Sequence, residues 1–341
     1  MIVKRVLECS PLESTLLRNF ALLRTSSFQS FFKLLLPFSL ALVLTSCCLC
    51  PDPKDKEDQS KHTLSPVELN SLSGLYQSLN KSERPKFECI QDVKTKKKLF
   101  FGYMLNLVRE HNLNILSARD TLSALQKKHT SFEATNKTIK NATSDETATL
   151  DGSDTPEIFT QDEKDWLTQL AKMHRVTPSL QDDAFFDQLF MAVDIIPASM
   201  ALAQAANESA WGTSRFAVQA NNLFGQWCFK PGCGVVPQQR PEGATYEVKL
   251  FSTPSEAVGQ YMLNINRNRS YQKVRNIRHS YRSQQQVISG NSLAGGLENY
   301  SARGEAYIEE LRSMISYNKL KQWDVAENEY PDISQLKAPD C

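Results

Sequence analysis

In the stretch Ala201-Leu202-Ala203-Gln204-Ala205-Ala206-Asn207-Glu208-Ser209-Ala210-Trp211-Gly212, a single carboxylate follows a run of small residues that favours a helix. Pro197 suits the first turn of a helix, so we expect the helix to begin there. With 3.6 residues per turn, Glu208 shares a face with Gln204 and Ala205 one turn back. This face is small and partly polar, and we expect it to be open to a ligand. Glu208 is therefore the first candidate for an active-site residue.

Helical patterns extend on both sides of this stretch. Apolar residues recur at helical spacing over residues 93–125, and two shorter helical patterns follow around Trp166 and Phe186. Thr253-Pro254-Ser255-Glu256 has the pattern of a capping box with proline at the first helical position, so another helix begins there. A last amphipathic pattern begins near Tyr307.

One segment shows the alternation of strands instead. Residues 235–240 and 245–251 flank a turn at residues 241–244, which is a pattern typical of a β-hairpin. Together with the helices around it, this segment predicts a mainly α fold. We expect an α+β domain that has a helical lobe and a small β-hairpin lobe.

Shifts in composition divide the 341 residues into successive segments. A polar stretch rich in Lys, Asp, Ser and Pro predicts a flexible tether. A later stretch of Thr, Ser, Asn and Asp with few apolar residues predicts a disordered insertion. We expect a signal peptide at 1–46, the tether at 47–84, an N-terminal helical region at 85–126, the insertion at 127–161, a catalytic domain at 162–325 and a C-terminal tail at 326–341.

The N-terminal segment has features of an export signal. Basic residues precede an apolar block at residues 31–44, which is shorter than the roughly 20 residues that span a bilayer. Leu44-Thr45-Ser46-Cys47 resembles the lipobox of bacterial lipoproteins, in which the cysteine is lipidated. This predicts a periplasmic protein anchored to a membrane through Cys47, with an ordinary signal peptide or a buried helix as alternatives. Cys48 is not an evident inner-membrane retention signal, which favours the outer membrane.

Charge and cysteine content narrow the kinds of ligand. A formal net charge of +1 gives no global basic field that would attract nucleic acid. Cys228 and Cys233 flank a short loop and could form a disulfide in an oxidising compartment, while free thiols are the alternative. A zinc site needs four ligands, and two cysteines with no nearby histidine cannot supply them. We therefore expect no metal and no organic cofactor.

Glycoside hydrolysis is a reaction that suits these residues. It needs a carboxylic acid that stays protonated near neutral pH, and partial burial raises the pKa of a glutamic acid toward that range. Glu208 lies between an alanine-rich helix and an aromatic ring, which is a setting of that kind. By itself the pattern is weak, because a glutamate near a helix end is more often structural. Aromatic platforms for sugar rings are available in Trp211, Phe224, Trp227, Tyr271 and Tyr300.

A longer motif strengthens this interpretation. Residues 201–225, which end in Asn221-Asn222-Leu223-Phe224-Gly225, resemble the signature of glycoside hydrolase family 73. These are bacterial glucosaminidases that cut peptidoglycan and have a mannosyl-glycoprotein endo-β-N-acetylglucosaminidase-like domain. Residues 225–237 resemble the Bax-like branch of that family, and residues 92–101 and 297–304 resemble it as well. The resemblance covers roughly residues 85–325 without the insertion.

The resemblance implies a lysozyme-like domain with a groove between its helical and β lobes. Glu208 matches the general acid of the family, and Tyr300 matches a tyrosine that helps to hold the sugar and the catalytic water. The family's Tyr-Ala-Thr-Asp reads Tyr-Ser-Ala-Arg here, so the role of Tyr300 transfers less securely. A second carboxylate is expected on the hairpin. Glu247 and Glu242 compete for this role, and we favour Glu247 because strand alternation can aim it at the groove.

The same resemblance implies a substrate and a set of contacts. We expect an endo-β-N-acetylglucosaminidase, without amidase activity, that hydrolyses the β-1,4 bond after N-acetylglucosamine in peptidoglycan glycan strands. The protein would be a monomer. The alternatives are a muramidase or lytic transglycosylase that uses the same acid, and a lipoprotein that binds the wall without cutting it. The candidate substrate-binding residues are Gln204, Trp211, Asn222, Phe224, Gln226, Trp227 and Tyr271.

A basic segment completes the candidates. Residues 265–282 contain six basic residues and no acidic one. Such a segment could attract the carboxylates of peptidoglycan stems, although a solvated helix face is the more common explanation.

Overall fold

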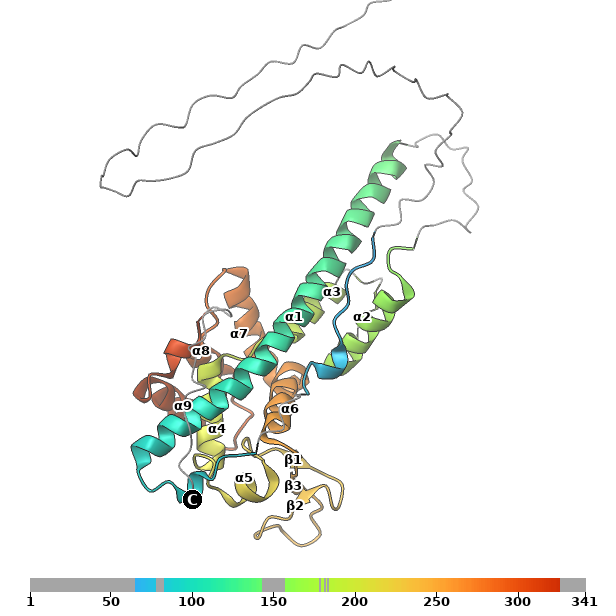
Figure 1. Ribbon diagram of the computed structural model, residues 1–341. Coiled ribbons are helices and arrows are strands. Elements are labelled where there is room, and N and C mark those ends of the chain that lie inside the picture. The colour runs from blue at the N-terminus through green and yellow to red at the C-terminus, as the bar shows by residue number, and fades with distance from the viewer. Residues whose placement is uncertain are drawn as a thin grey trace, which may run out of the picture. The chain divides into compact units, whose positions relative to one another are not determined.

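The computed structural model describes residues 65–77, 83–142 and 157–325, except residues 178, 181 and 183. These described residues form a mainly helical domain with a small antiparallel sheet, as the sequence predicts (Figure 1). The helices are α1 Val93–Ala142, α2 Gln161–His174, α3 Phe185–Ala192, α4 Ala198–Ser209, α5 Arg215–Ala220, α6 Pro254–Arg267, α7 Gln272–Ser283, α8 Gly290–Leu293 and α9 Glu305–Tyr317. Short 3-10 turns are η1 Leu72–Gly74, η2 Phe87–Cys89, η3 Arg269–Tyr271, η4 Ala294–Gly296 and η5 Leu320–Trp323.

The sheet has three short strands in the order β1-β3-β2, both pairs antiparallel. The strands are β1 Trp227–Cys228, β2 Gly234–Val235 and β3 Glu247–Lys249. The β2–β3 pair corresponds to the predicted hairpin, but its connection is longer than the four-residue turn that the sequence indicated. The edge strand β1 was not predicted, because two residues are too few to show alternation. The sheet lies beside α5, at one end of the helices.

Helix α4 lies at the centre of the domain. It packs against α1, α8, α9 and η5, and every residue from Ala198 to Ala206 is buried. Small side chains let the neighbouring helices approach its backbone closely. The expectation of an open, ligand-facing surface on this helix is therefore wrong for Gln204 and Ala205, whose side chains have no exposed area. Glu208, one turn further on, is only half-buried.

Helix α1 is longer than the sequence predicted. It continues to Ala142, so residues 127–142 are helical and do not belong to a disordered insertion that begins after residue 126. Much of this part of the helix is exposed, which explains its polar composition without disorder. It is also tied to the domain, because the buried Lys128 ammonium pairs with Glu163 of α2 at 2.8 Å. Residues 143–156 of the predicted insertion lie outside the described residues.

The predicted tether at residues 47–84 also needs correction. Within residues 65–77, Leu72, Leu75 and Tyr76 are buried in the hydrophobic core. The Tyr76 hydroxyl accepts a hydrogen bond from Asn266 at 2.9 Å and lies 2.9 Å from Nε2 of His174. This part of the chain is therefore packed on the domain. The predicted signal peptide, Cys47 and the C-terminal tail lie outside the described residues.

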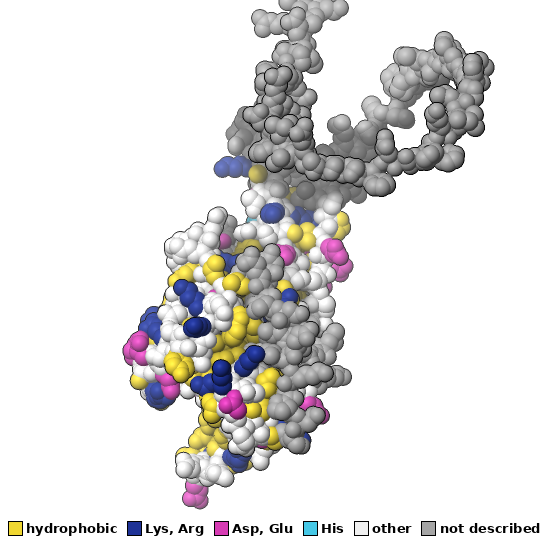
Figure 2. Space-filling model, turned by 60° about the vertical axis from the view of Figure 1, so that its left-hand side comes forward, with side chains coloured by type: hydrophobic (Ala, Val, Ile, Leu, Met, Phe, Trp, Pro, Cys, Tyr) yellow, Lys and Arg dark blue, Asp and Glu magenta, His cyan; other side chains and the backbone are white. Residues whose placement is uncertain are grey.

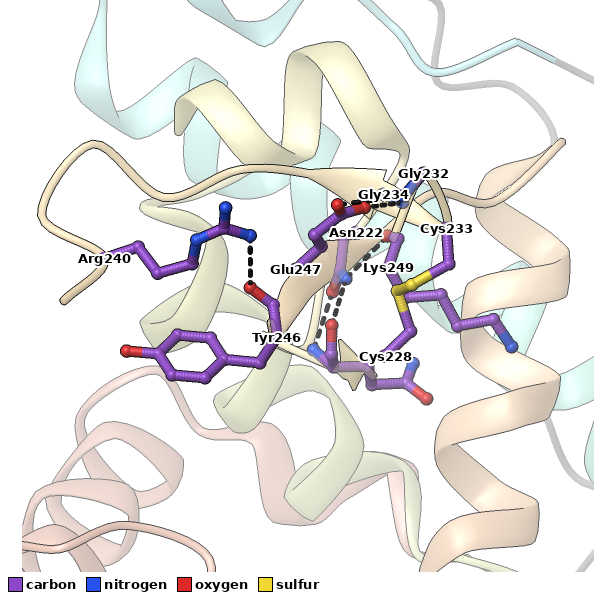
Figure 3. Close-up of a disulfide and its surroundings, with 10 residues drawn as sticks. Asn222, Cys228, Gly232, Cys233, Gly234, Arg240, Tyr246, Glu247 and Lys249 are labelled. Atoms are coloured by element: carbon purple, nitrogen blue, oxygen red, sulfur yellow. Dashed lines mark hydrogen bonds between the residues drawn. A yellow bond between two sulfur atoms is a disulfide. The ribbon is translucent and has the colours of Figure 1, made fainter. Parts of the chain in front are cut away.

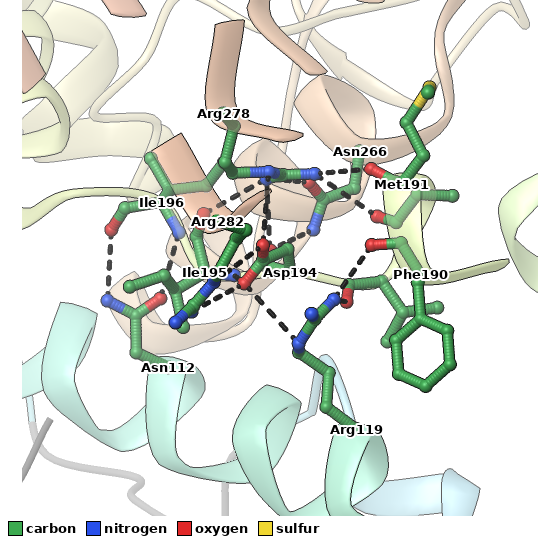
Figure 4. Close-up of polar contacts among 12 residues, drawn as sticks. Asn112, Arg119, Phe190, Met191, Asp194, Ile195, Ile196, Asn266, Arg278 and Arg282 are labelled. Atoms are coloured by element: carbon green, nitrogen blue, oxygen red, sulfur yellow. Dashed lines mark hydrogen bonds and ion pairs between the residues drawn. The ribbon is translucent and has the colours of Figure 1, made fainter. Parts of the chain in front are cut away.

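A buried ion cluster fixes the loop that leads into α4 (Figure 4). Asp194 is 2% exposed and is approached by Arg119 of α1 at 3.6 Å, and by Arg278 and Arg282 of α7 at 3.8 and 2.9 Å. Burial alone would raise the pKa of Asp194, but the three guanidinium groups hold it below its ordinary value. Arg119 and Arg278 also donate hydrogen bonds to carbonyl oxygens in residues 190–195.

The basic segment at residues 265–282 is thus partly internal. Arg278 is 1% exposed, and Arg275 donates to the carbonyl oxygens of Ile265 and Asn268. Both of the roles weighed for this segment assumed solvated side chains, which does not hold for these two arginines. Figure 2 shows basic side chains scattered among hydrophobic and acidic ones over one face of the molecule.

Among the described residues, no helix combines the length and the hydropathy needed to cross a bilayer.

Candidate active site

Glu208 lies in the last turn of α4, where the chain turns sharply. The three residues after Ser209, the last residue of α4, all have positive φ, with values of 47° for Ala210, 60° for Trp211 and 77° for Gly212. The carboxyl group faces the backbone of Gly225, since a Cβ atom placed there would lie 3.3 Å from Oε2 of Glu208. Gly225 itself has a φ of +64°, which favours glycine. A glycine at this position therefore leaves room beside the carboxyl group.

The electrostatic setting of Glu208 suits a general acid. Burial raises its pKa above the ordinary value of a glutamic acid, and the nearby charge of Glu310 adds to this. A hydrogen bond from Tyr307 and the charge of Arg303 act in the opposite direction, but the net effect is a raised pKa. A carboxyl group with a raised pKa keeps its proton at a higher pH, as an acid catalyst must.

Three tyrosines from different segments lie together in this region. The ring of Tyr300 stacks on that of Tyr307 with a centroid distance of 5.6 Å, and the centroid of the Tyr271 ring lies 5.9 Å from that of Tyr300. The Tyr300 hydroxyl donates to the carbonyl oxygen of Phe224 at 2.8 Å. The charge of Glu208 contributes to the raised pKa of both Tyr300 and Tyr271. The structure therefore brings Tyr300 and Tyr271 into the neighbourhood of Glu208.

Residues 222–226 form a segment beside Glu208, and Tyr300 is bonded to this segment through the carbonyl oxygen of Phe224. Phe224 is buried and stacks on Tyr261 with a centroid distance of 3.9 Å. The buried Asn222 amide donates to the carbonyl oxygens of Gln226 and Lys249, at 2.8 and 2.9 Å. The Gln226 amide donates to the carbonyl of a residue in α6 at 2.9 Å. Phe224 and Asn222 thus fix the conformation of this segment through contacts with other parts of the protein.

The two tryptophans predicted as sugar platforms have different surroundings. Trp211 packs edge-on against Phe101 of α1, with a centroid distance of 5.0 Å, and the Lys97 ammonium lies 4.6 Å from its ring. Trp227 is 49% exposed and packs edge-on against Tyr246, the residue before β3. Trp227 therefore presents an aromatic surface to solvent, whereas Trp211 mainly joins the end of α4 to α1.

Glu247 is directed at a neighbouring loop (Figure 3). Its two carboxylate oxygens accept hydrogen bonds from the backbone N–H groups of Gly232 and Gly234, at 2.9 and 2.8 Å. These donors hold the pKa of Glu247 below its ordinary value. The loop is closed by a disulfide between Cys228 and Cys233, the pair for which the sequence favoured a bridge. Glu242, the competing candidate, is exposed in the long connection between β2 and β3.

The two sulfur atoms and the Glu247 carboxylate lie within 4.8 Å of one another. This spacing resembles that of metal ligands, but sulfur atoms joined in a disulfide are not thiolates and do not bind a metal in that way. The cluster is explained by the bridge and by the loop that it closes.

Sequence reasoning did not predict the contacts that two residues make beside the acid. Tyr307 was assigned to the apolar stripe of the last helix, and Gln204 to a face in contact with ligand. Both are buried, and their polar groups bond to each other at 3.1 Å. A buried tyrosine hydroxyl and a buried amide both need hydrogen-bond partners. The presence of a tyrosine and a glutamine on helix faces that pack in the core was therefore the signal in the sequence that could have indicated this bond.

Comparisons with known proteins assign part of the chain to a family. Residues 186–320 match the family described as Glucosaminidase, mannosyl-glycoprotein endo-beta-N-acetylglucosaminidase. Protein bax of Escherichia coli (strain K12) is 35% identical over 134 residues, which make up 39% of this chain and 47% of Protein bax. The chain therefore covers less than half the length of that relative, and no solved structure matches it. Residues 186–320, which contain Glu208, the tyrosines and the sheet, form a domain of the glucosaminidase family (glycoside hydrolase family 73), and Protein bax is a distant homologue of the chain.

Proposed function

We propose that the protein is a peptidoglycan hydrolase that cleaves the β-1,4 bond after N-acetylglucosamine, with Glu208 as the general acid. The observation that carries this proposal is the half-buried carboxyl group of Glu208, with its raised pKa, inside a glucosaminidase-family domain. In the reaction, Glu208 would donate its proton to the glycosidic oxygen that leaves. The glycan would lie in a lysozyme-like groove between the helices and the sheet, with the exposed ring of Trp227 as one platform.

Glu247 is our proposed second carboxylate. Its lowered pKa keeps it ionised, as a base or a charge stabiliser requires. Each carboxylate oxygen has two lone pairs, so the bonds from Gly232 and Gly234 leave acceptor positions for a water molecule. The backbone donors would then hold the carboxylate in place during the reaction.

Paired variants test the choice of second carboxylate. In Glu247→Gln we expect the rate of glycan cleavage to fall by about 10²-fold or more, because a positioned base contributes about 10² to 10⁴-fold. In Glu242→Gln, a change of the same chemistry at an exposed site, we expect cleavage within about twofold of wild type. Clearing rates of purified sacculi measure both. Cleavage that persists in the first variant and is lost in the second assigns the role to Glu242.

We also propose a periplasmic protein, lipidated at Cys47 and anchored to a bacterial membrane, preferably the outer one, as a monomer. The described part of the chain supports export, since it contains the disulfide between Cys228 and Cys233. Disulfides form in oxidising compartments such as the periplasm and are rare in the cytosol.

Analysis of digestion products tests the proposed reaction. Purified sacculi are digested, the products are reduced with borohydride, and the fragments are separated and identified by mass spectrometry. We expect reduced N-acetylglucosamine at the new ends. Reduced muramic ends would assign a muramidase instead, and anhydro-muramic ends a lytic transglycosylase. Sacculi that bind the protein without any new ends would leave a wall-binding lipoprotein.

A further inference from the structure

A chain of buried polar side chains leads to Glu208 from the interior of the domain. The Tyr261 hydroxyl, on α6, donates to Oε1 of Gln204 at 2.7 Å. Nε2 of Gln204, on α4, donates to the Tyr307 hydroxyl at 3.1 Å. The Tyr307 hydroxyl, on α9, interacts in turn with the Glu208 carboxyl group, and each group affects the pKa of the other. Three helices thus contribute to one path that ends at the acid.

The donors and acceptors give this path a direction. Oε1 of Gln204 accepts from Tyr261, so the amide turns its Nε2 toward Tyr307. An amide nitrogen donates only, and the Tyr307 oxygen therefore acts as its acceptor. The Tyr307 proton is then free to point at Glu208. Tyr261 and Gln204 have almost no exposed surface, so water cannot easily replace either of them.

We propose that Tyr307 is a positioning residue for the acid, and that Tyr261 and Gln204 keep its hydroxyl proton directed at the Glu208 carboxyl group. The inference rests on the proposed function, because it assigns Tyr307 a role in the reaction of that same site. It is distinct from the role implied for Tyr300, whose hydroxyl is bonded to the Phe224 carbonyl oxygen. Tyr307 acts on the orientation and the proton affinity of Glu208 and need not touch the glycan.

The interaction with Tyr307 also acts against the effect of burial on the pKa of Glu208. Burial raises the pKa of Glu208, and the bond from Tyr307 favours the ionised form and lowers it. Loss of that bond therefore raises the pKa further. The titratable and charged groups that interact with Glu208 come from α9, from the segment before it and from η3, and they are Tyr307, Glu310, Arg303, Tyr300 and Tyr271.

Tyr307→Phe is the first test, because it removes only the hydroxyl. We expect the clearing rate of sacculi to fall about 10-fold to 100-fold, as for a misplaced catalytic group. We also expect the alkaline limb of the pH–rate profile to move to higher pH, because a general acid with a raised pKa keeps its proton longer. Tyr261→Phe should move the limb in the same direction by less, since Gln204 could then turn its amide and divert the Tyr307 proton.

The matched control is Tyr317→Phe, which makes the same change on the same helix at a side chain that is 81% exposed. It should leave both the rate and the pH profile at wild-type values. Circular dichroism of each variant confirms folding, and if Tyr307→Phe does not fold, Tyr261→Phe decides the question.

A second readout does not depend on catalysis. Protein labelled with ¹³C at glutamate side-chain carboxyl groups is titrated by NMR, and the Glu208 signal is assigned by its absence in Glu208→Gln. We expect Glu208 to titrate at higher pH in Tyr307→Phe than in wild type. Identical titration of Glu208 in the two proteins overturns the inference. If wild-type protein does not cleave glycans, the proposed function fails, and the NMR titration still shows whether Tyr307 acts on Glu208.

Discussion

Glu208→Gln is expected to lower the rate of glycan cleavage by about 10³-fold or more, the largest effect of any single substitution in the site. Glutamine has nearly the shape of glutamic acid, and it can still accept the hydrogen bond from Tyr307. It cannot transfer a proton to the leaving oxygen. The loss would therefore reflect the missing proton donor. It would not reflect a change in packing, because glutamine fills the same space beside Gly225 as glutamic acid does.

The clearing rate of purified sacculi measures this loss. Glu305→Gln is a suitable control, because it makes the same change in the first turn of α9 at a side chain that is largely exposed. Its rate should stay within about twofold of wild type. Thermal unfolding should show that both variants are folded. Wild-type clearing by folded Glu208→Gln would refute the assignment of the acid.

Asp194→Ala is expected to have the largest effect on stability, a loss of about 3–5 kcal/mol in the free energy of unfolding. The substitution leaves the buried guanidinium group of Arg278 and the partly buried one of Arg119 without their carboxylate, although both keep hydrogen bonds to the loop at residues 190–195. Removal of one partner of a buried ion pair costs far more than the pair itself contributes. Because that loop leads into α4, we expect Glu208 to be less firmly held in its position as well.

Urea unfolding followed by circular dichroism measures the change. Arg312→Gln, which breaks exposed ion pairs on α9, is the control and should cost no more than about 1 kcal/mol. An equal effect of the two substitutions would contradict the role of the buried cluster. The pH dependence has a definite sign, since the folded-state pKa of Asp194 is lowered. Its contribution is present above the unfolded-state pKa of about 3.9 and is lost as the pH falls through the lower folded-state value.

Local patterns predicted the parts of the fold that depend on neighbours in the chain. The capping box at Thr253 does begin α6, with the Thr253 hydroxyl bonded to the N–H of Glu256. The helix that carries Glu208 and the pairing of β2 with β3 were also visible in the sequence. These features follow from spacing within a few residues, which a single sequence contains.

Features that depend on distant segments were not predictable in the same way. The helical period predicted that Gln204 lies on the same face as Glu208. It could not show that Gln204 is buried between α6 and α9 and is hydrogen-bonded to a tyrosine hydroxyl from each. The polar composition of residues 127–142 suggested disorder, although an exposed helix has the same composition. Lys128 gave no local sign of its partner Glu163, which lies 35 residues away in the sequence. Tertiary contacts decide each of these cases.

The bridge between Cys228 and Cys233 has a consequence for when the domain matures. It closes the loop whose N–H groups hold Glu247, and bonds of this kind do not persist in a reducing cytosol. A newly made chain would carry this loop open, with the carboxylate less firmly held, until it reached oxidising surroundings. In the exported protein that we propose, oxidation would complete the surroundings of Glu247 only after the chain has left the cytosol.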